Sequence, residues 1–128
     1  MSTPSVISVV DDDPHVRAAM NNLLKSRGYV VHTFSSAEEF LRSAERDDTS
    51  CVIADIQMPV VSGLELLAHT RAQGSAIPFI FITGFPEDGV RDRALKAGAT
   101  CFLAKPFAGS ALIRCLETAL EGPGEPTA

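Results

Sequence analysis

Polar side chains able to hold a cation or a phosphoryl group stand at or directly after the ends of four apolar runs. They are Asp11, Asp12, Asp55, Thr83 and Lys105. Carboxylate oxygens are the ligands that Mg²⁺ prefers, while an ammonium and a hydroxyl can bind the oxygens of a phosphoryl group. This combination predicts phosphoryl transfer, because the charge of the transferred group spreads over its oxygens. Asp55 is the expected nucleophile, since an aspartate can form an aspartyl phosphate.

Three carboxylates in one crevice repel one another, and without a cation at least one should keep a proton at neutral pH. A Mg²⁺ ion would relieve this repulsion, and Lys105 would add positive charge opposite the metal. Taken singly, Thr83 would be an ordinary strand residue and Lys105 a solvated charge, so only their occurrence together favours a site. Asp13 is expected only to cap a helix. Three histidines stand away from the strand ends and are expected on the surface or in packing: His15, His32 and His69.

The elements that position these side chains are five short apolar runs, each followed by a helical pattern. Continuous apolar runs bounded by turn residues are typical of buried strands. The expected strands are 6–10, 30–34, 51–54, 79–83 and 101–104. Strands that alternate with helices predict a parallel sheet with helices on both faces. We expect an α/β fold of the flavodoxin-like (βα)5 type, doubly wound, with strand order 2-1-3-4-5 and a ligand crevice between strands 1 and 3.

Capping residues place the first two helices. Asp13 followed by Pro14 predicts the start of a helix, because Asp caps well and Pro fits the first helical position. Ser36 and Glu39 predict a capping box for a short helix that reaches Ala44.

The later helices are predicted from apolar spacing. A polar loop is expected at 47–50, before the strand at 51–54. The third helix is expected over 63–73, and the residues on one of its faces are Leu64, Leu67, Ala68 and Arg71. A more polar helix is expected over 87–97 and a final one over 109–120.

Size and charge bound the class of protein. With 128 residues the chain has the size of one domain, expected over 1–121, followed by a flexible tail or linker stub at 122–128 that is rich in Gly and Pro. A net charge of −5 argues against a nucleic-acid surface. No apolar run approaches the roughly 20 residues that cross a bilayer, and the start lacks the positive region of a signal peptide. The three cysteines lack a CxxC motif and indicate core residues in the cytoplasm: Cys51, Cys101 and Cys115.

These motifs resemble the receiver domain of bacterial two-component response regulators. The resemblance covers roughly residues 6–120 and rests on four motifs in order: VVDDDP, ADIQMPVVSGLEL, FITG and KPF. Each motif alone is weak, but four at the expected spacing are specific. The residues of these motifs are most similar to those of the FixJ-type subgroup.

The resemblance implies a phosphoacceptor and a metal site. Asp55 would take a phosphoryl group from a histidine of a sensor histidine kinase. Asp12, Asp55 and the main-chain carbonyl of Gln57 would bind Mg²⁺, with Asp11 acting through a water. Such a domain is not an enzyme beyond its own phosphotransfer and autodephosphorylation.

The resemblance also implies a switch. Thr83 and Lys105 would bind the phosphoryl oxygens, Thr83 would move inward, and Phe102 would turn inward behind it. The bond between Lys105 and Pro106 would be cis. The loop after Thr83 departs from the usual pattern, because Phe85 and its following proline add bulk and stiffness next to the site.

Three other functions compete with this interpretation. A receiver-like scaffold would act without phosphate, but such proteins usually lose the acceptor, the acid pair or the lysine. A haloacid-dehalogenase-type phosphatase would need a DxDG context, whereas Asp11 and Asp13 are followed by Pro14. A nucleotide-binding flavodoxin-like protein would need a loop rich in Gly or Ser after the first strand, where this chain has acids that repel phosphate.

The resemblance implies partners beyond the kinase. Phosphorylation is expected to act on the face made by the fourth helix, fifth strand and fifth helix, often through a homodimer. Other expected outputs are a downstream effector protein or a DNA-binding domain outside this sequence. No helix-turn-helix is present in the 128 residues.

Overall fold

The computed structural model describes residues 4–58, 61–84, 87 and 89–121. Five parallel strands form one sheet in the order β2-β1-β3-β4-β5. Their bounds are β1 Val6–Val10, β2 Val30–Phe34, β3 Cys51–Asp55, β4 Phe79–Thr83 and β5 Cys101–Ala104. The expected flavodoxin-like topology is therefore confirmed.

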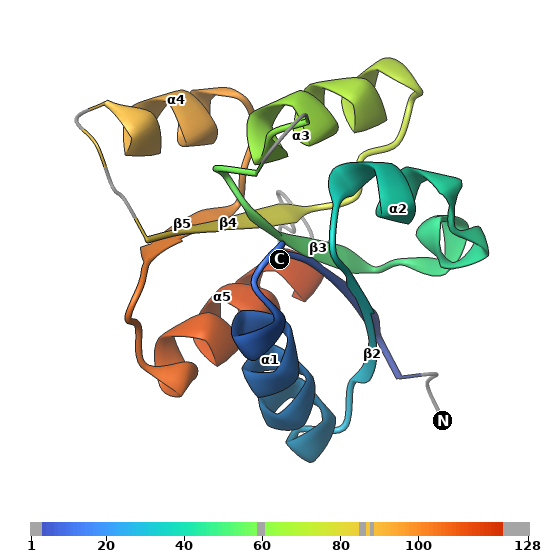
Figure 1. Ribbon diagram of the computed structural model, residues 1–128, viewed down its shortest axis with the longest axis vertical. Helices are drawn as coiled ribbons and strands as arrows, with labels where there is room; N and C mark the ends of the chain where they lie inside the picture. The colour runs from blue at the N-terminus through green and yellow to red at the C-terminus, as the bar shows by residue number, and fades with distance from the viewer. Residues whose placement is uncertain (1–3, 59–60, 85–86, 88, 122–128) are drawn as a thin grey trace.

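Helices cover both faces of this sheet, as Figure 1 shows. On one face lie α2 (Ala37–Arg42), α3 (Gly63–Ala72) and α4 (Val90–Lys96), and on the other lie α1 (Pro14–Ser26) and α5 (Gly109–Glu121). A 3₁₀ helix, η1 (Ala44–Asp48), follows α2. Each face has its own apolar core, which we call the α2–α4 cluster and the α1/α5 cluster.

The central strands are buried along their whole length. Every residue of β3 and β4 is buried, because both faces of the sheet are covered. Burying one Ile or Phe side chain stabilises the fold by about 1.5–3 kcal/mol. Asp55 and Thr83, which end these strands, are thereby carried on the most firmly held part of the molecule.

Three helix starts show the value of capping signals. The Asp13 carboxylate accepts a hydrogen bond from the His15 amide at 2.9 Å, which confirms the predicted cap. Ser36 caps α2, but the Glu39 carboxylate accepts from the amide of Ser35 rather than from that of Ser36, so the predicted capping box is only half formed. A complete capping box, not predicted, closes the start of α3 between Ser62 and Glu65.

The predicted reach of the second helix was wrong. It ends at Arg42 instead of including Ala44, because the Ser43 hydroxyl accepts a hydrogen bond from the Glu45 amide and starts η1. The 3₁₀ helix also takes up the first part of the expected polar loop at 47–50.

Two other helices differ from their predictions. The fourth starts at Val90 rather than at residue 87, because Gly89 has a left-handed backbone with φ +82°. The buried face of α3 is shifted one residue towards the N-terminus: Leu66, Leu67 and Thr70 are buried while Ala68 is exposed. The buried Thr70 hydroxyl is satisfied by donating to the Leu66 carbonyl at 2.8 Å.

Some expectations fall outside the described residues. These are the tail at 122–128 and the two loop residues Phe85 and Pro86. None of the helices described here is long and apolar enough to cross a membrane.

Gly63, the first residue of α3, is required by a close approach to β3. A Cβ at this position would lie 2.6 Å from the Asp55 carbonyl oxygen and 3.0 Å from Ile56 Cα. Both neighbours are backbone, so neither can move aside without displacing the chain next to the Asp55 side chain.

We predict that Gly63→Ala lowers the free energy of unfolding by about 1–3 kcal/mol through this overlap. Gly109→Ala is the matched control, because Gly109 also begins a helix but an added Cβ there would meet only Leu23 side-chain atoms at 3.4–3.5 Å. Urea unfolding of both variants measures the difference. Equal stability of the two variants would contradict the packing argument.

Candidate functional site

The carboxyl ends of β1 and β3 bring three acidic side chains together. One carboxylate oxygen from each of Asp11, Asp12 and Asp55 lies within 4.8 Å of the others. Asp11 is fully buried, Asp55 is buried except for a small exposed fraction, and Asp12 is exposed. We call these three residues the acidic cluster. Its oxygen-only donor set suits a hard divalent cation such as Mg²⁺.

Asp11 is the most constrained member of the acidic cluster. Its carboxylate accepts from the Asp13 amide at 2.8 Å, and its main-chain carbonyl accepts from Arg17 Nη1 at 2.7 Å. Burial raises the pKa of Asp11, and neither the Asp13 amide nor the charge of Lys105 fully compensates. The fold thus holds a carboxylate where its ionised form is unfavourable.

The Asp55 carboxylate is oriented by two donors. Its Oδ1 accepts from the Gln57 amide at 2.8 Å, which fixes the turn after β3. Its Oδ2 accepts from Lys105 Nζ at 3.2 Å. Asp55 therefore stands at the open end of a buried strand with its side chain held in place.

Lys105 joins the acidic cluster from the end of β5. Its ammonium lies 3.3 Å from Asp11 Oδ2 and 3.2 Å from Asp55 Oδ2. Burial tends to lower the pKa of Lys105, but the charges of Asp11 and Asp55 outweigh it and the pKa is raised. The lysine therefore carries its positive charge at neutral pH. The peptide bond between Lys105 and Pro106 is cis, as the resemblance implied.

Thr83 ends β4 and is fully buried. Its hydroxyl lies 3.0 Å from the Gln57 side-chain oxygen and donates to it. Gln57 thus contacts the site twice, through its amide to Asp55 and through its side chain to Thr83. Phe102 is not at the acidic cluster: it is half-buried on β5 and packs against the α2–α4 cluster.

Sequence reasoning missed two residues that shape this site. Arg17 is bound to the Asp11 carbonyl, and Gly63 allows α3 to approach the Asp55 carbonyl. A signal for Arg17 was its place in the second turn of a helix that begins directly after the acids. Gly63 was predicted as the start of a helix, but its spacing gave no sign that α3 approaches the backbone of Asp55 so closely.

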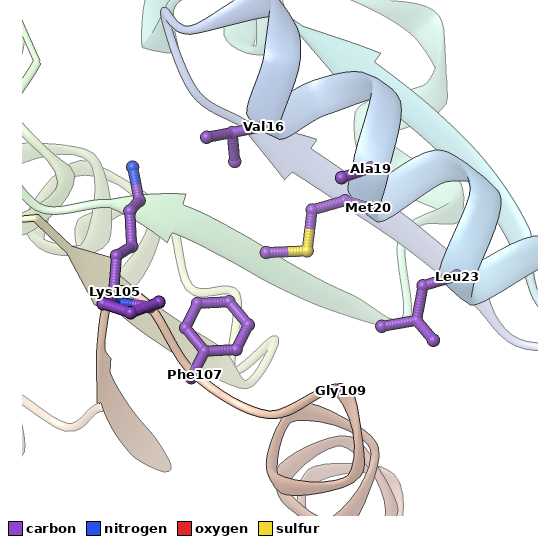
Figure 2. Close-up of a pocket in the computed structure, with 8 residues that line it drawn as sticks. Val16, Ala19, Met20, Leu23, Lys105, Phe107 and Gly109 are labelled. Atoms are coloured by element: carbon purple, nitrogen blue, oxygen red, sulfur yellow. The ribbon is translucent and has the colours of Figure 1, made fainter.

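An apolar hollow of about 390 Å³ adjoins Lys105 (Figure 2). It lies between α1 and the segment that leads from β5 into α5. Its lining residues are Val16, Ala19, Met20, Leu23, Lys105, Pro106, Phe107 and Gly109. Figure 2 shows the Phe107 ring and the Met20 side chain facing each other across it. An apolar surface next to a charged site suits contact with another protein.

Comparison with known proteins matches the sequence of this chain to one family. The response regulator receiver domain matches residues 7–117. Response regulator protein TodT of Pseudomonas putida is 39% identical over 117 residues, which are 91% of this chain and 52% of TodT. Transcriptional regulatory protein FixJ of Bradyrhizobium diazoefficiens is 38% identical over 128 residues, which are all of this chain and 62% of FixJ.

Solved structures agree with the fold. The crystal structure of FixJ-N has a TM-score of 0.83 at 33% identity and covers 99% of each chain. A response regulator receiver domain protein from Clostridium thermocellum has a TM-score of 0.85 at 28% identity and covers 91% of this chain and 94% of its own. The chain spans only about half to three-fifths of the curated relatives TodT and FixJ. Over the matched residues, this chain belongs to the response regulator receiver domains of two-component signalling systems.

Proposed function

We propose that Asp55 accepts a phosphoryl group from a phosphohistidine of a sensor histidine kinase. The observation that carries the proposal is the Lys105 ammonium, which bridges Asp55 and Asp11 beside the third acid of the cluster. One carboxylate would be enough to form an ion pair with Lys105. Three carboxylates around one lysine leave excess negative charge, which fits a cation site next to a nucleophile.

In the proposed reaction an Asp55 carboxylate oxygen attacks phosphorus as the bond from phosphorus to the donor nitrogen breaks. Mg²⁺ held by Asp11, Asp12, Asp55 and the Gln57 carbonyl would neutralise charge on the transferred oxygens. Lys105 holds the Asp55 carboxylate before the reaction and binds a phosphoryl oxygen after it. Attack by water on phosphorus would later break the bond to the Asp55 oxygen, release inorganic phosphate and return the domain to its resting state.

Thr83 and Gln57 form the resting state of the proposed switch. The Thr83 hydroxyl donates to a neutral amide oxygen, at 3.0 Å. A phosphoryl oxygen on Asp55 is a charged and stronger acceptor, so Thr83 would exchange one acceptor for the other. Phe102 on the neighbouring strand would follow and alter the surface made by α4, β5 and α5.

Partners and location follow from this proposal. The altered surface would act through a homodimer, a downstream effector, or a DNA-binding domain outside this sequence. We place the domain in the cytoplasm, where such kinases present their phosphohistidine. No feature of the described residues favours the scaffold or phosphatase alternatives.

Phosphoryl uptake tests the proposal directly. Incubation with acetyl phosphate and Mg²⁺ is expected to add one phosphoryl group to the wild type and none to Asp55→Asn, as measured by intact mass. Asp13→Asn is the matched control, because Asn keeps the helix cap and Asp13 is outside the acidic cluster. Uptake by Asp55→Asn, or loss of uptake in Asp13→Asn, would overturn the assignment.

A second prediction concerns the buried acid. The pKa of Asp11 in the fold is raised above its unfolded value of 3.8. The free energy of unfolding should therefore be highest below pH 3.8, where Asp11 is protonated, and fall as the pH rises from 3.8 through the folded pKa. At neutral pH the ionised group destabilises the fold, and Asp11→Asn should raise the urea midpoint of the metal-free protein. The same change should weaken Mg²⁺ binding by about 10-fold or more.

Asp12→Asn separates the effect of Asp11→Asn on stability from its effect on Mg²⁺ binding. Asp12 is exposed, so its replacement should weaken Mg²⁺ binding without raising the urea midpoint. Calorimetric Mg²⁺ titration and urea unfolding across pH measure both quantities. A lower midpoint for Asp11→Asn at neutral pH would refute the argument from burial.

A third prediction concerns the hollow in Figure 2. A kinase that presents a phosphohistidine to Asp55 would cover this apolar surface, which begins at Lys105. Ala19→Glu places a charge in the hollow and should slow transfer from a phosphorylated kinase about 10-fold or more, while uptake from acetyl phosphate stays unchanged. Asn22→Glu, exposed on the same helix but outside the hollow, is the control. Equal slowing with both donors would show that the variant damages the site itself.

A further inference from the structure

Two of the three cysteines meet between β5 and α5. Cys101 on β5 and Cys115 on α5 line one hollow of about 300 Å³, and both are partly exposed. The Cys101 side chain is close enough to the Cys115 thiol to contribute to the raised pKa of Cys115. The third cysteine, Cys51, is fully buried on β3, which β4 separates from β5. Two thiols therefore line one accessible hollow, while the remaining thiol is enclosed.

The surroundings of this pair favour oxidation over metal binding. The other residues that line the hollow are Leu103, Ala111, Arg114 and Thr118, which include no further metal ligand of the Cys, His or carboxylate type. Within the described residues the acidic cluster forms the one group of three such ligands. Two thiols that line one hollow can instead join as a disulfide, which requires Cβ atoms about 3.8 Å apart and Cβ vectors that point towards each other.

We propose that Cys101 and Cys115 form a reversible intramolecular disulfide when the protein meets a peroxide. The Cys101 sulfur attacks one peroxide oxygen, the O–O bond breaks, and a sulfenic acid forms as the first water leaves. The Cys115 sulfur then attacks the Cys101 sulfur, and a second water leaves as the S–S bond closes. Two thiols lose two electrons and two protons, and one peroxide is reduced to two waters.

Burial, and next the contact with Cys101, raises the pKa of Cys115 to about 12. This thiol stays mostly protonated at neutral pH, and because the thiolate is the attacking form, closure of the S–S bond is expected to be slow. The pair should therefore react slowly with weak oxidants.

The bridge would act on the strand that carries the proposed switch. Cys101 faces the α1/α5 cluster, and the next residue, Phe102, faces the α2–α4 cluster. A covalent link would fix the start of β5 to α5 on one side of Phe102. This inference stands independently of the phosphoacceptor proposal, because it requires neither Asp55 nor Mg²⁺.

Thiol counting tests the proposal. The full chain is treated with hydrogen peroxide, denatured, alkylated with N-ethylmaleimide and weighed, and its peptides are mapped. Alkylated thiols are expected to fall from three to one, with a linked peptide pair containing Cys101 and Cys115 that a reductant separates. Three alkylated thiols, oxygen additions without a crosslink, a link to Cys51, or covalent dimers would each overturn it.

Variants and stability give an independent check. Cys51→Ala should still protect two thiols, whereas Cys101→Ala and Cys115→Ala should form no intramolecular link. The oxidised wild type should unfold at higher urea than the reduced protein, because the closed loop restricts the unfolded chain. The two variants that lack one thiol of the pair should show no such shift. A shift in those variants would assign the stabilisation to another cause.

Discussion

The site depends on a balance of charge at the end of a buried sheet. Asp11 is fully buried with a raised pKa, and Asp55 lies beside it with little exposure. The Lys105 ammonium and the turn amides of Asp13 and Gln57 keep this arrangement stable. These contacts hold the site together, but they leave more negative than positive charge in it. A divalent cation would neutralise that excess.

Rigid neighbours make this balance possible. Like charges stay close only if the backbone prevents them from moving apart. The fully buried strand β3 fixes Asp55, and Gly63 lets α3 pack directly on the Asp55 carbonyl. Arg17 binds the Asp11 carbonyl from α1, so the acid-bearing turn is held from the helix that follows it. The geometry of the carboxylates is therefore set by packing and backbone contacts, and their own repulsion works against it.

The sequence was sufficient for features that depend on local chemistry. Apolar runs such as 51–54 identified all five strands, and the carboxyl ends of parallel strands brought Asp55 and Lys105 to one edge. The Asp13 cap followed from side-chain chemistry alone. The one-residue shift in the buried face of α3 could not be predicted, because Leu64 and Leu66 are equally apolar and the close contact at Gly63 decides between them. The thiol pair was missed for a similar reason: Cys101 and Cys115 meet only once α5 packs on the sheet edge.

The same strand links the two chemical inputs inferred for this domain. β5 begins at Cys101, which faces α5, and is followed directly by Lys105, which contacts Asp55. Between them Phe102 points to the opposite core, because successive side chains of a strand alternate in direction. β5 has only four residues, so the proposed covalent link at Cys101 would restrict Phe102, the next residue, in the proposed response to phosphorylation. Phosphorylation and oxidation would then favour either the same conformation of β5 or two different ones. The position of Phe102 in each modified form would distinguish these two cases.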